Sequence, residues 1–334
     1  AIFGFLGLFA MHHARLENLS ARNPALDWLV NVVHGDPTDL RGWGPKLDAW
    51  AFGLGLVAGT IEGGTVLNLK GMLVLELPGP RVLLFVKANI LSERPDTKGT
   101  DTGALFAVVD VNPQRVLIGI QFEYEIEAVL DLKVPIEAGF FYDPPLFPPE
   151  HFYVDAGTIA QPITAKVLQL FDATAYFMVH GDGIPDFPLG ALQGFSVAAG
   201  FRSSFIWGNT DIGLYLRIAS GFDVGIGFAP LFFAGRIFIE GELRLFIVSI
   251  EASGKLTFRS NGVDTLLDGE ICGRVSFFFF SVKGCVGFAI GTDPSAPPVP
   301  DPIRDLLLQS RSPALIEGTG VDRGIDTVLC HGTT

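Results

Sequence analysis

The tripeptide His-Gly-Asp occurs twice, at residues 34–36 and 180–182, and brings together groups that could do chemistry. A histidine and a carboxylate can transfer protons or bind a cation, and the second copy is followed closely by Asp186. The same residues also suit a turn that closes a secondary-structure element, with glycine in a left-handed conformation. Calcium loops carry acidic residues at a higher density, so the sequence favours the turn.

The segment FFYDPPLFPPEHFYVD, residues 140–155, contains the densest mixture of aromatic and ionisable side chains. Its candidate site residues are Tyr142, Asp143, His151 and Tyr153. Carboxylates beside a stacking aromatic ring could bind a sugar or hydrolyse it, which makes a carbohydrate-active or other hydrolytic enzyme one hypothesis. An ordered surface loop explains the same residues without chemistry. The sequence has no nucleophile elbow, phosphate-binding loop or dinucleotide fingerprint, so we expect that the protein is not an enzyme.

The segment CGRVSFFFFSVKGC, residues 272–285, reads almost the same in both directions. Folded as a hairpin about Phe278 and Phe279, it has one wholly apolar face and one polar face, as an antiparallel sheet with a single apolar side requires. The hairpin places Cys272 opposite Cys285, at a separation that suits a disulfide, and two separate thiols are the alternative. Cys330 is left over. The sequence contains no zinc-binding motif, and we expect no metal and no cofactor.

Four more stretches fold in the same way into hairpins that share an apolar face. Their turns are expected at Pro78–Arg81, Asn112–Arg115, 219–221 and 246–249. The last turn would place Arg244 opposite Glu251. Five successive hairpins predict an all-β fold: an antiparallel meander with one apolar face, forming a curved sheet or a sandwich, plus two or three short helices.

One alternating run is unusually long. From Val116 to Phe140 every even position is apolar or alanine, and many odd positions are charged. Because strands rarely exceed ten residues, this run must bend or break, and Pro135 is the expected place. If the protein is a carrier, the expected ligand-binding residues are the apolar side chains of this run: Ile118, Ile120, Phe122, Tyr124 and Ile126.

Helices are expected at residues 23–35, with Asn23 as N-cap and Pro24 in the first turn, and at 161–173. The predicted organisation is an N-terminal strand and helix over 1–44, a hairpin meander over 45–292, a Pro-rich linker over 293–302, and a short helix with a C-terminal tail over 303–334.

The composition is apolar and acidic. The chain of 334 residues has 49% hydrophobic residues and a net charge of −13, which argues against nucleic-acid partners. No apolar run reaches the roughly 18 residues of a spanning helix, so no transmembrane segment is expected. No signal peptide is recognised, and the apolar start without an initiator Met indicates a piece of a longer chain. The compartment stays open, with a secreted or cell-surface location favoured.

Three segments, LNLKGMLVLELPGPRVLLFVKANIL, ATAYFMVHGDGIPDFP and GEICGRVSFFFFSVKGCV, carry a resemblance that spans most of residues 45–290. They resemble a family of large bacterial proteins with a C-terminal domain of unknown function. The resemblance implies a β-rich module of a longer polypeptide and brings no catalytic residues with it.

Two further functional hypotheses follow from the shared apolar face. A structural or interaction module would cover this face with a second sheet and the helices, and would bind a protein partner or associate with itself through its apolar hairpin tips. A carrier would instead leave a groove and fill it with lipid or another hydrophobic ligand. The first hypothesis is preferred, and the second is the alternative.

Overall fold

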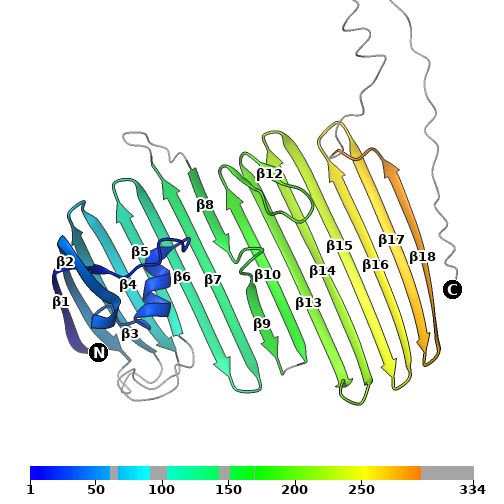
Figure 1. Ribbon diagram of the computed structural model, residues 1–334, viewed down its shortest axis with the longest axis horizontal. Helices are drawn as coiled ribbons and strands as arrows, with labels where there is room; N and C mark the ends of the chain where they lie inside the picture. The colour runs from blue at the N-terminus through cyan, green and yellow to red at the C-terminus, as the bar shows by residue number, and fades with distance from the viewer. Residues whose placement is uncertain (61–66, 91–103, 143–150, 169, 295–334) are drawn as a thin grey trace, which may run out of the picture.

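A computed structural model describes residues 1–60, 67–90, 104–142, 151–168 and 170–294. The described chain forms one 16-stranded antiparallel sheet in which sequential strands lie side by side (Figure 1). The all-β prediction is confirmed. The strands of this sheet are β1 (Ile2–Arg15), β2 (Trp43–Gly59), β3 (Leu67–Leu77), β4 (Arg81–Ile90), β5 (Ala104–Asn112), β6 (Arg115–Ile126), β7 (Leu130–Phe141), β8 (His151–Ala156), β9 (Ile163–Val167), β10 (Phe171–His180), β13 (Ser196–Asn209), β14 (Leu214–Phe228), β15 (Leu231–Leu245), β16 (Val248–Ser260), β17 (Thr265–Phe277) and β18 (Phe280–Gly291).

Two strands share one position in the meander. Both β8 and β9 pair with β7 on one side and β10 on the other, β8 along one part of these strands and β9 along another. The loop between them leaves the sheet after Gly157, whose amide donates to the carbonyl of Pro135 at 2.7 Å. A separate pair of two-residue strands, β11 (Gly183–Ile184) and β12 (Leu192–Gln193), packs over the sheet near β13 and β14.

The expected first helix is confirmed as a short one. It consists of α1 (Pro24–Asp27), continued by a π-helical turn, η1 (Trp28–Val32). The side chain of Asn23 accepts a hydrogen bond from the amide of Leu26, as an N-cap does. A 3₁₀ turn, η2 (Leu40–Gly42), leads into β2. No helix in the described part of the chain has the length and apolar character needed to cross a membrane.

The sheet curls around this helical segment. Trp28 lies against Trp43 of β2 and Phe85 of β4, with ring centroids 5.7 and 5.4 Å apart, and the guanidinium of Arg15 of β1 lies 5.3 Å from its ring. A side chain at Gly119 of β6 would collide with Leu26. Six flat strands would be about 24 Å wide, twice the width of a helix. The face that holds α1 is therefore concave at this end (Figure 1).

The main hydrophobic core lies inside this curl. Trp28 and Leu29 fill its centre. The sheet contributes residues of β2 to β5: Trp43, Ala51, Met72, Val74, Leu83, Phe85, Ala104, Phe106 and Val108. Beside the helix β3 and β4 are apolar on both faces, and their continuous runs MLVL (72–75) and VLLFV (82–86) are typical of strands with two apolar faces.

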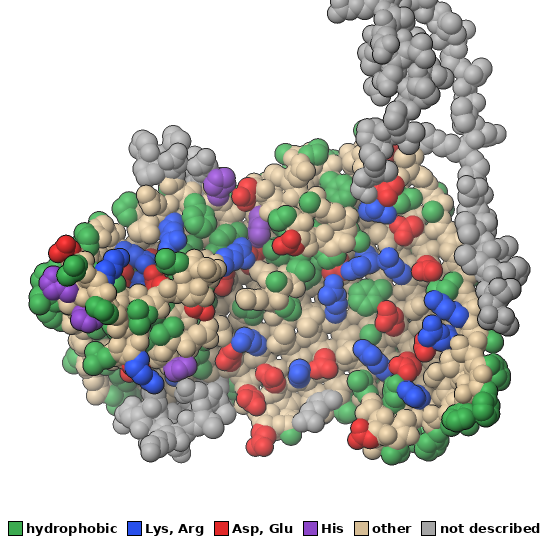
Figure 2. All heavy atoms as spheres, viewed as in Figure 1, with side chains coloured by type: hydrophobic (Ala, Val, Ile, Leu, Met, Phe, Trp, Pro, Cys, Tyr) green, Lys and Arg blue, Asp and Glu red, His purple; other side chains and the backbone are tan. Residues whose placement is uncertain are grey.

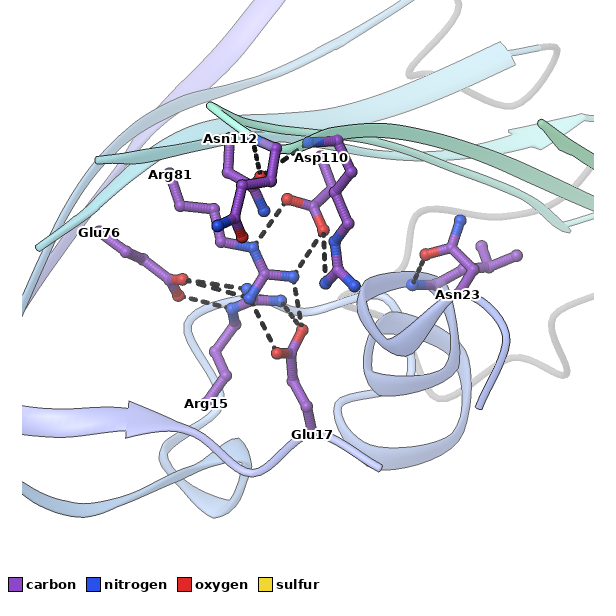
Figure 3. Close-up of polar contacts among 10 residues, drawn as sticks. Arg15, Glu17, Asn23, Glu76, Arg81, Asp110 and Asn112 are labelled. Atoms are coloured by element: carbon purple, nitrogen blue, oxygen red, sulfur yellow. Dashed lines mark hydrogen bonds and ion pairs between the residues drawn. The ribbon is translucent and has the colours of Figure 1, made fainter. Parts of the chain in front are cut away.

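Buried charges close one end of this core. Arg15 and Arg81 form ion pairs with Glu17, Glu76 and Asp110, at nitrogen–oxygen distances from 2.5 to 3.9 Å (Figure 3). Arg115 adds a longer contact of 3.8 Å to Asp110. Three guanidinium groups thus meet three carboxylates, so the network carries no net charge and each buried ion has a partner.

Three predicted hairpins are confirmed. Phe277 pairs with Phe280, so Phe278 and Phe279 form the turn of the β17–β18 hairpin. Cys272 and Cys285 face each other and form a disulfide. The turns near Pro78–Arg81 and Asn112–Arg115 also stand where the sequence predicts them. Cys330 and the expected C-terminal helix lie outside the described residues.

The predicted turn at 219–221 is wrong. Residues 214–228 form one continuous strand, β14, because its even positions all lie on one face without a turn. The polar residue in the middle of that row, Ser220, has a partner in Ser203 of β13, and their hydroxyl oxygens lie 3.1 Å apart. The turn at 246–249 is two residues shorter than predicted. Leu245 pairs with Val248, so Glu251 faces Glu242 rather than Arg244.

The second expected helix is also wrong. Residues 161–173 contain β9 and the start of β10, because strand pairing with β7 satisfies the backbone of this segment. The long run 116–140 does break, but at residues 127–129, where Ala128 has a φ of 60°. Pro135 instead lies inside β7, opposite Gln121. Pro135 is tolerated because it lies at the gap between the residues of β7 that pair with β9 (130–133) and those that pair with β8 (136–141), where no ladder hydrogen bond needs its amide.

Candidate functional site

The two His-Gly-Asp motifs have different structures. In the first, Gly35 adopts a φ of 81°, and Asp36 accepts hydrogen bonds from the amide and hydroxyl of Thr38 at 3.0 and 2.6 Å. Asp36 also forms an ion pair with Lys70 at 2.8 Å. Hydrogen bonds from Lys70 and Thr38 lower its pKa, although burial opposes them. This copy is the turn that the sequence favours.

The second motif joins the 151–155 segment. Strands β8 and β10 pair in a register that puts His180 opposite Tyr153. The Nε2 atom of His180 lies 2.9 Å from Oδ1 of Asp155, and His151 lies 3.4 Å from Asp182. Two groups of candidate residues that the sequence treats separately are therefore neighbours, because strand pairing connects them. No local motif signals this contact.

Arg22 completes the cluster from outside the sheet. It precedes α1 in the chain and forms an ion pair of 2.5 Å with Oδ2 of Asp155, whose side chain is 1% exposed. Its guanidinium also lies 3.6 Å from the centre of the Tyr153 ring, which is a close cation–π contact. Asp155 is buried between Arg22 and His180. Sequence reasoning missed Arg22, which stands in a loop far along the chain from its partners, whereas Asp155 is the last residue of the 140–155 segment that the sequence singles out.

These residues line a hollow of about 570 Å³ on the concave face, between the segment that leads into α1 and the β11–β12 pair. Figure 2 views this side of the molecule. The lining combines charged residues with an apolar wall: Arg22, Pro135, Glu137, Asp155, Gly157, Thr158, Ile159, Ala160, Gln161, Met178, His180, Ile184, Pro185 and Asp186.

Burial shifts two ionisable groups here. It raises the pKa of Glu137, and the carboxylate of Asp155 raises it further, although Arg22 opposes both effects. Burial also raises the pKa of Tyr153 to about 12. The hydroxyl of Tyr153 has no hydrogen-bond partner in the described part of the chain. The hollow thus contains a partly desolvated carboxylate, and such groups are common in binding sites.

The predicted loop site is only partly assembled. Tyr153 and His151 lie at or beside the cluster, whereas Asp143 lies outside the described residues. The amide of Tyr142 donates to the carbonyl of Gln114 at 2.8 Å, which holds that end of the segment to the β5–β6 turn.

One group of potential metal ligands occurs in the described residues, namely Glu270, Cys272 and Cys285. The two cysteines form the disulfide, so neither offers a thiolate to a metal ion. This group therefore makes no metal site.

No protein-family model, curated protein or solved structure matches this chain.

The second candidate site is the opposite face of the sheet. The pairing registers put one row from every strand on this face, such as Leu73 of β3, Phe122 of β6 and Ile237 of β15. From β3 to β18, none of the described residues in these rows carries a charge. The rows consist of Val, Leu, Ile, Phe, Ala and Gly, with a few Ser, Thr, Asn, Tyr and Trp. We call this surface the apolar face.

Large side chains on the apolar face are open to solvent. Trp207 is 66% exposed and Ile271 is 70% exposed. The other exposed members include Phe5, Phe9, Leu54, Leu73, Leu75, Leu84, Phe177, Phe205, Ile218, Phe222, Ile237, Ile239, Ile250, Leu256, Val282, Val286, Phe288 and Ile290. Such patches are rare on soluble monomers beyond a few hundred Å².

The five expected ligand-binding residues lie on this face. Ile118, Ile120, Phe122 and Tyr124 are half-buried and Ile126 is exposed, in one row along β6. The rings of Phe122 and Tyr124 stack at 6.2 Å. The row lies on the side of the sheet that faces away from α1, so it borders a convex surface rather than the groove that a carrier requires.

Proposed function

We propose that the protein is a lipid-contacting β module, whose apolar face lies against the hydrocarbon of a bilayer. One observation carries the proposal: the apolar face is free of charge across the described strands from β3 to β18. Acyl chains accept such a surface, and each Leu or Phe side chain that leaves water contributes about 1.5–3 kcal/mol. This is a form of the lipid-binding hypothesis in which the lipid surrounds the sheet instead of filling a groove.

The curvature supports lipid over a protein partner. The apolar face is convex where the sheet curls around α1, and two rigid convex surfaces touch over only a few strands. Fluid hydrocarbon follows a curved surface and can cover all its rows. A second copy packed face to face would leave many of the exposed side chains in water.

The concave face supports the same orientation. Over β13 to β18 it shows Lys, Arg, Asp and Glu side chains in alternation (Figure 2). Many are paired across strands, such as Arg236 with Asp223 and Arg274 with Glu251 at 3.5 Å. These charges suit water. The sheet is therefore amphipathic across its thickness, with its polar side turned away from the proposed lipid.

The strand lengths are compatible with a bilayer. β17 has 13 residues, which extend about 43 Å along the strand. At a tilt of about 45° this length covers about 30 Å, the thickness of the hydrocarbon core. The disulfide of β17 and β18 lies on the polar side of these strands, so it does not interrupt the apolar rows.

The test uses two double variants on the same strand. Val282 and Val286 lie on the apolar face of β18 and are 63% and 62% exposed, whereas Ser281 and Ala289 lie on its polar face. The protein is refolded in the presence of phosphatidylcholine vesicles, which carry no net charge, and separated by flotation. We expect the wild type to float with the vesicles.

The two double variants add the same charge to opposite faces of β18, so they distinguish the effect of the face from the effect of the added charge. Val282→Asp with Val286→Asp should shift most of the protein to the aqueous fraction, because two carboxylates would enter hydrocarbon. Ser281→Asp with Ala289→Asp adds the same charge to the polar face and should float like the wild type. A wild type that stays in the aqueous fraction, or forms a dimer that hides Val286 from solvent, would refute the proposal.

A further inference from the structure

The hollow beside Arg22 lies on the concave side and takes no part in the proposed lipid contact. Its charges can be counted from their contacts. Both ring nitrogens of His180 face acceptors, the carbonyl of Gly183 at 3.1 Å and Asp155 at 2.9 Å. Both ring nitrogens are therefore occupied, and the guanidinium of Arg22 is occupied by Asp155.

Three carboxylates line the same hollow: Asp155, Glu137 and Asp186. These three carboxylates outnumber the two basic side chains of the lining, Arg22 and His180. Asp155 is already engaged by Arg22 and His180, at 2.5 and 2.9 Å.

Two of these carboxylates, Glu137 and Asp186, have no ion pair in the described residues, and Glu137 is the more buried of the two. It lies directly opposite Asp155 across the β7–β8 pair, and in the described part of the chain it forms no ion pair within 4.0 Å. The neighbouring carboxylates of Glu137 and Asp155 repel each other. A cation that binds to Glu137 from within the hollow would relieve this repulsion.

The remaining wall is apolar. Ile159, Met178 and Ile184 line it with Pro135 and Pro185. The second hydrophobic cluster of the protein, which includes Met178 and Ile184, packs behind them and fixes their positions. A volume of about 570 Å³ lies in the range of sites for small organic ligands.

We propose that this hollow binds a small organic ammonium ion. Its charged nitrogen lies at the carboxylate of Glu137, and its apolar body packs against Ile159, Met178 and Ile184. A bare metal cation would leave the apolar wall in contact with water, whereas an amine with a hydrocarbon body satisfies both parts of the lining.

The probe is benzylammonium chloride, compared with benzyl alcohol, which has a similar shape and no charge. Titration calorimetry at neutral pH should show benzylammonium binding at least about tenfold more tightly than benzyl alcohol. Glu137→Gln preserves the shape of the side chain and should remove this difference. Asp186→Asn, a change at an exposed residue, should reduce it by a smaller factor.

Glu123→Gln is the matched control. Glu123 lies on the same side of the sheet in β6, but Lys133 already pairs with it at 2.7 Å, so this variant should bind both probes like the wild type. Equal binding of the two probes, or a tenfold preference that persists in Glu137→Gln, would overturn the proposal. Vesicle flotation of Glu137→Gln should match the wild type, which separates this proposal from the lipid-contact proposal.

Discussion

The guanidinium of Arg81 holds the carboxylate of Asp110 through two parallel hydrogen bonds of 2.7 and 2.5 Å, at a point where Asp110 has no exposed surface. Arg81→Met should lower the free energy of unfolding by about 3–5 kcal/mol, because it leaves a buried carboxylate without its main partner. Urea unfolding followed by circular dichroism measures this loss. Arg41→Met removes an exposed ion pair with Asp39 and should change little. Similar midpoints for the two variants would show that the network is not structural.

Tryptophan fluorescence tests which face meets lipid. Trp207 lies on the apolar face and Trp50 lies on the same face of β2, whereas Trp28 and Trp43 are buried in the core. Vesicles with brominated acyl chains should quench part of the emission, because bromine quenches the tryptophans that it contacts. Trp207→Phe should remove part of the quenched emission, and adding Trp50→Phe should leave only the emission of Trp28 and Trp43, which should be insensitive to bromine. Quenching that is unchanged in Trp207→Phe contradicts this orientation.

The disulfide should stabilise the last hairpin. A bridge that closes a loop of this size contributes about 3 kcal/mol at most through the entropy of the unfolded chain. The double variant Cys272→Ser, Cys285→Ser should therefore unfold at lower urea concentration without losing the rest of the sheet. Peptide mapping of the oxidised wild type should recover a Cys272–Cys285 peptide. Recovery of Cys330 in a bridge to either residue would show that another pairing exists.

The burial of Tyr153 predicts that the folded protein loses stability at alkaline pH. Burial raises its folded-state pKa to about 12, above the value near 10 of an unfolded chain. Its contribution to stability is therefore complete below about pH 10 and is lost as the pH rises towards 12. Tyr153→Phe should move the alkaline unfolding midpoint to higher pH and leave the urea midpoint at pH 7 nearly unchanged. Absorbance at 295 nm follows the ionisation, and a midpoint that does not move argues against this assignment.

The sequence predicts the apolar face well but not what covers it. Alternation along strands such as residues 280–290 assigns each side chain to a face, and the structure keeps those assignments. Whether a second layer packs on that face depends on contacts between distant segments, which alternation does not encode. The helix could have been placed from the sequence, because residues 72–75 (MLVL) and 82–86 (VLLFV) are apolar at every position. In these strands the row opposite the apolar face is also apolar. Such a row requires a covering layer on that side of the sheet, which is where α1 packs.

Turns and the polar cluster were harder to predict. A shift of two residues keeps every side chain on its face, so face patterns could not distinguish Glu251 opposite Arg244 from Glu251 opposite Glu242. The cluster of Arg22, Asp155 and His180 unites three segments that are far apart in the chain. Each residue alone resembles an ordinary surface group, and only the strand order puts them together.

The strand order also determines how the sheet can grow. The path from β1 to β18 passes through fifteen strands, each antiparallel to the next, so its first and last strands run in the same direction. If both apolar faces stay on one side, an edge of β18 can therefore meet a β1 edge only as a parallel pair. Two β18 edges related by a twofold axis perpendicular to the sheet would pair antiparallel and keep both apolar faces on one side. Unpaired backbone groups at a sheet edge are costly in hydrocarbon. The odd number of strands in the path therefore favours pairing of two identical edges, β18 with β18, over pairing of β18 with β1.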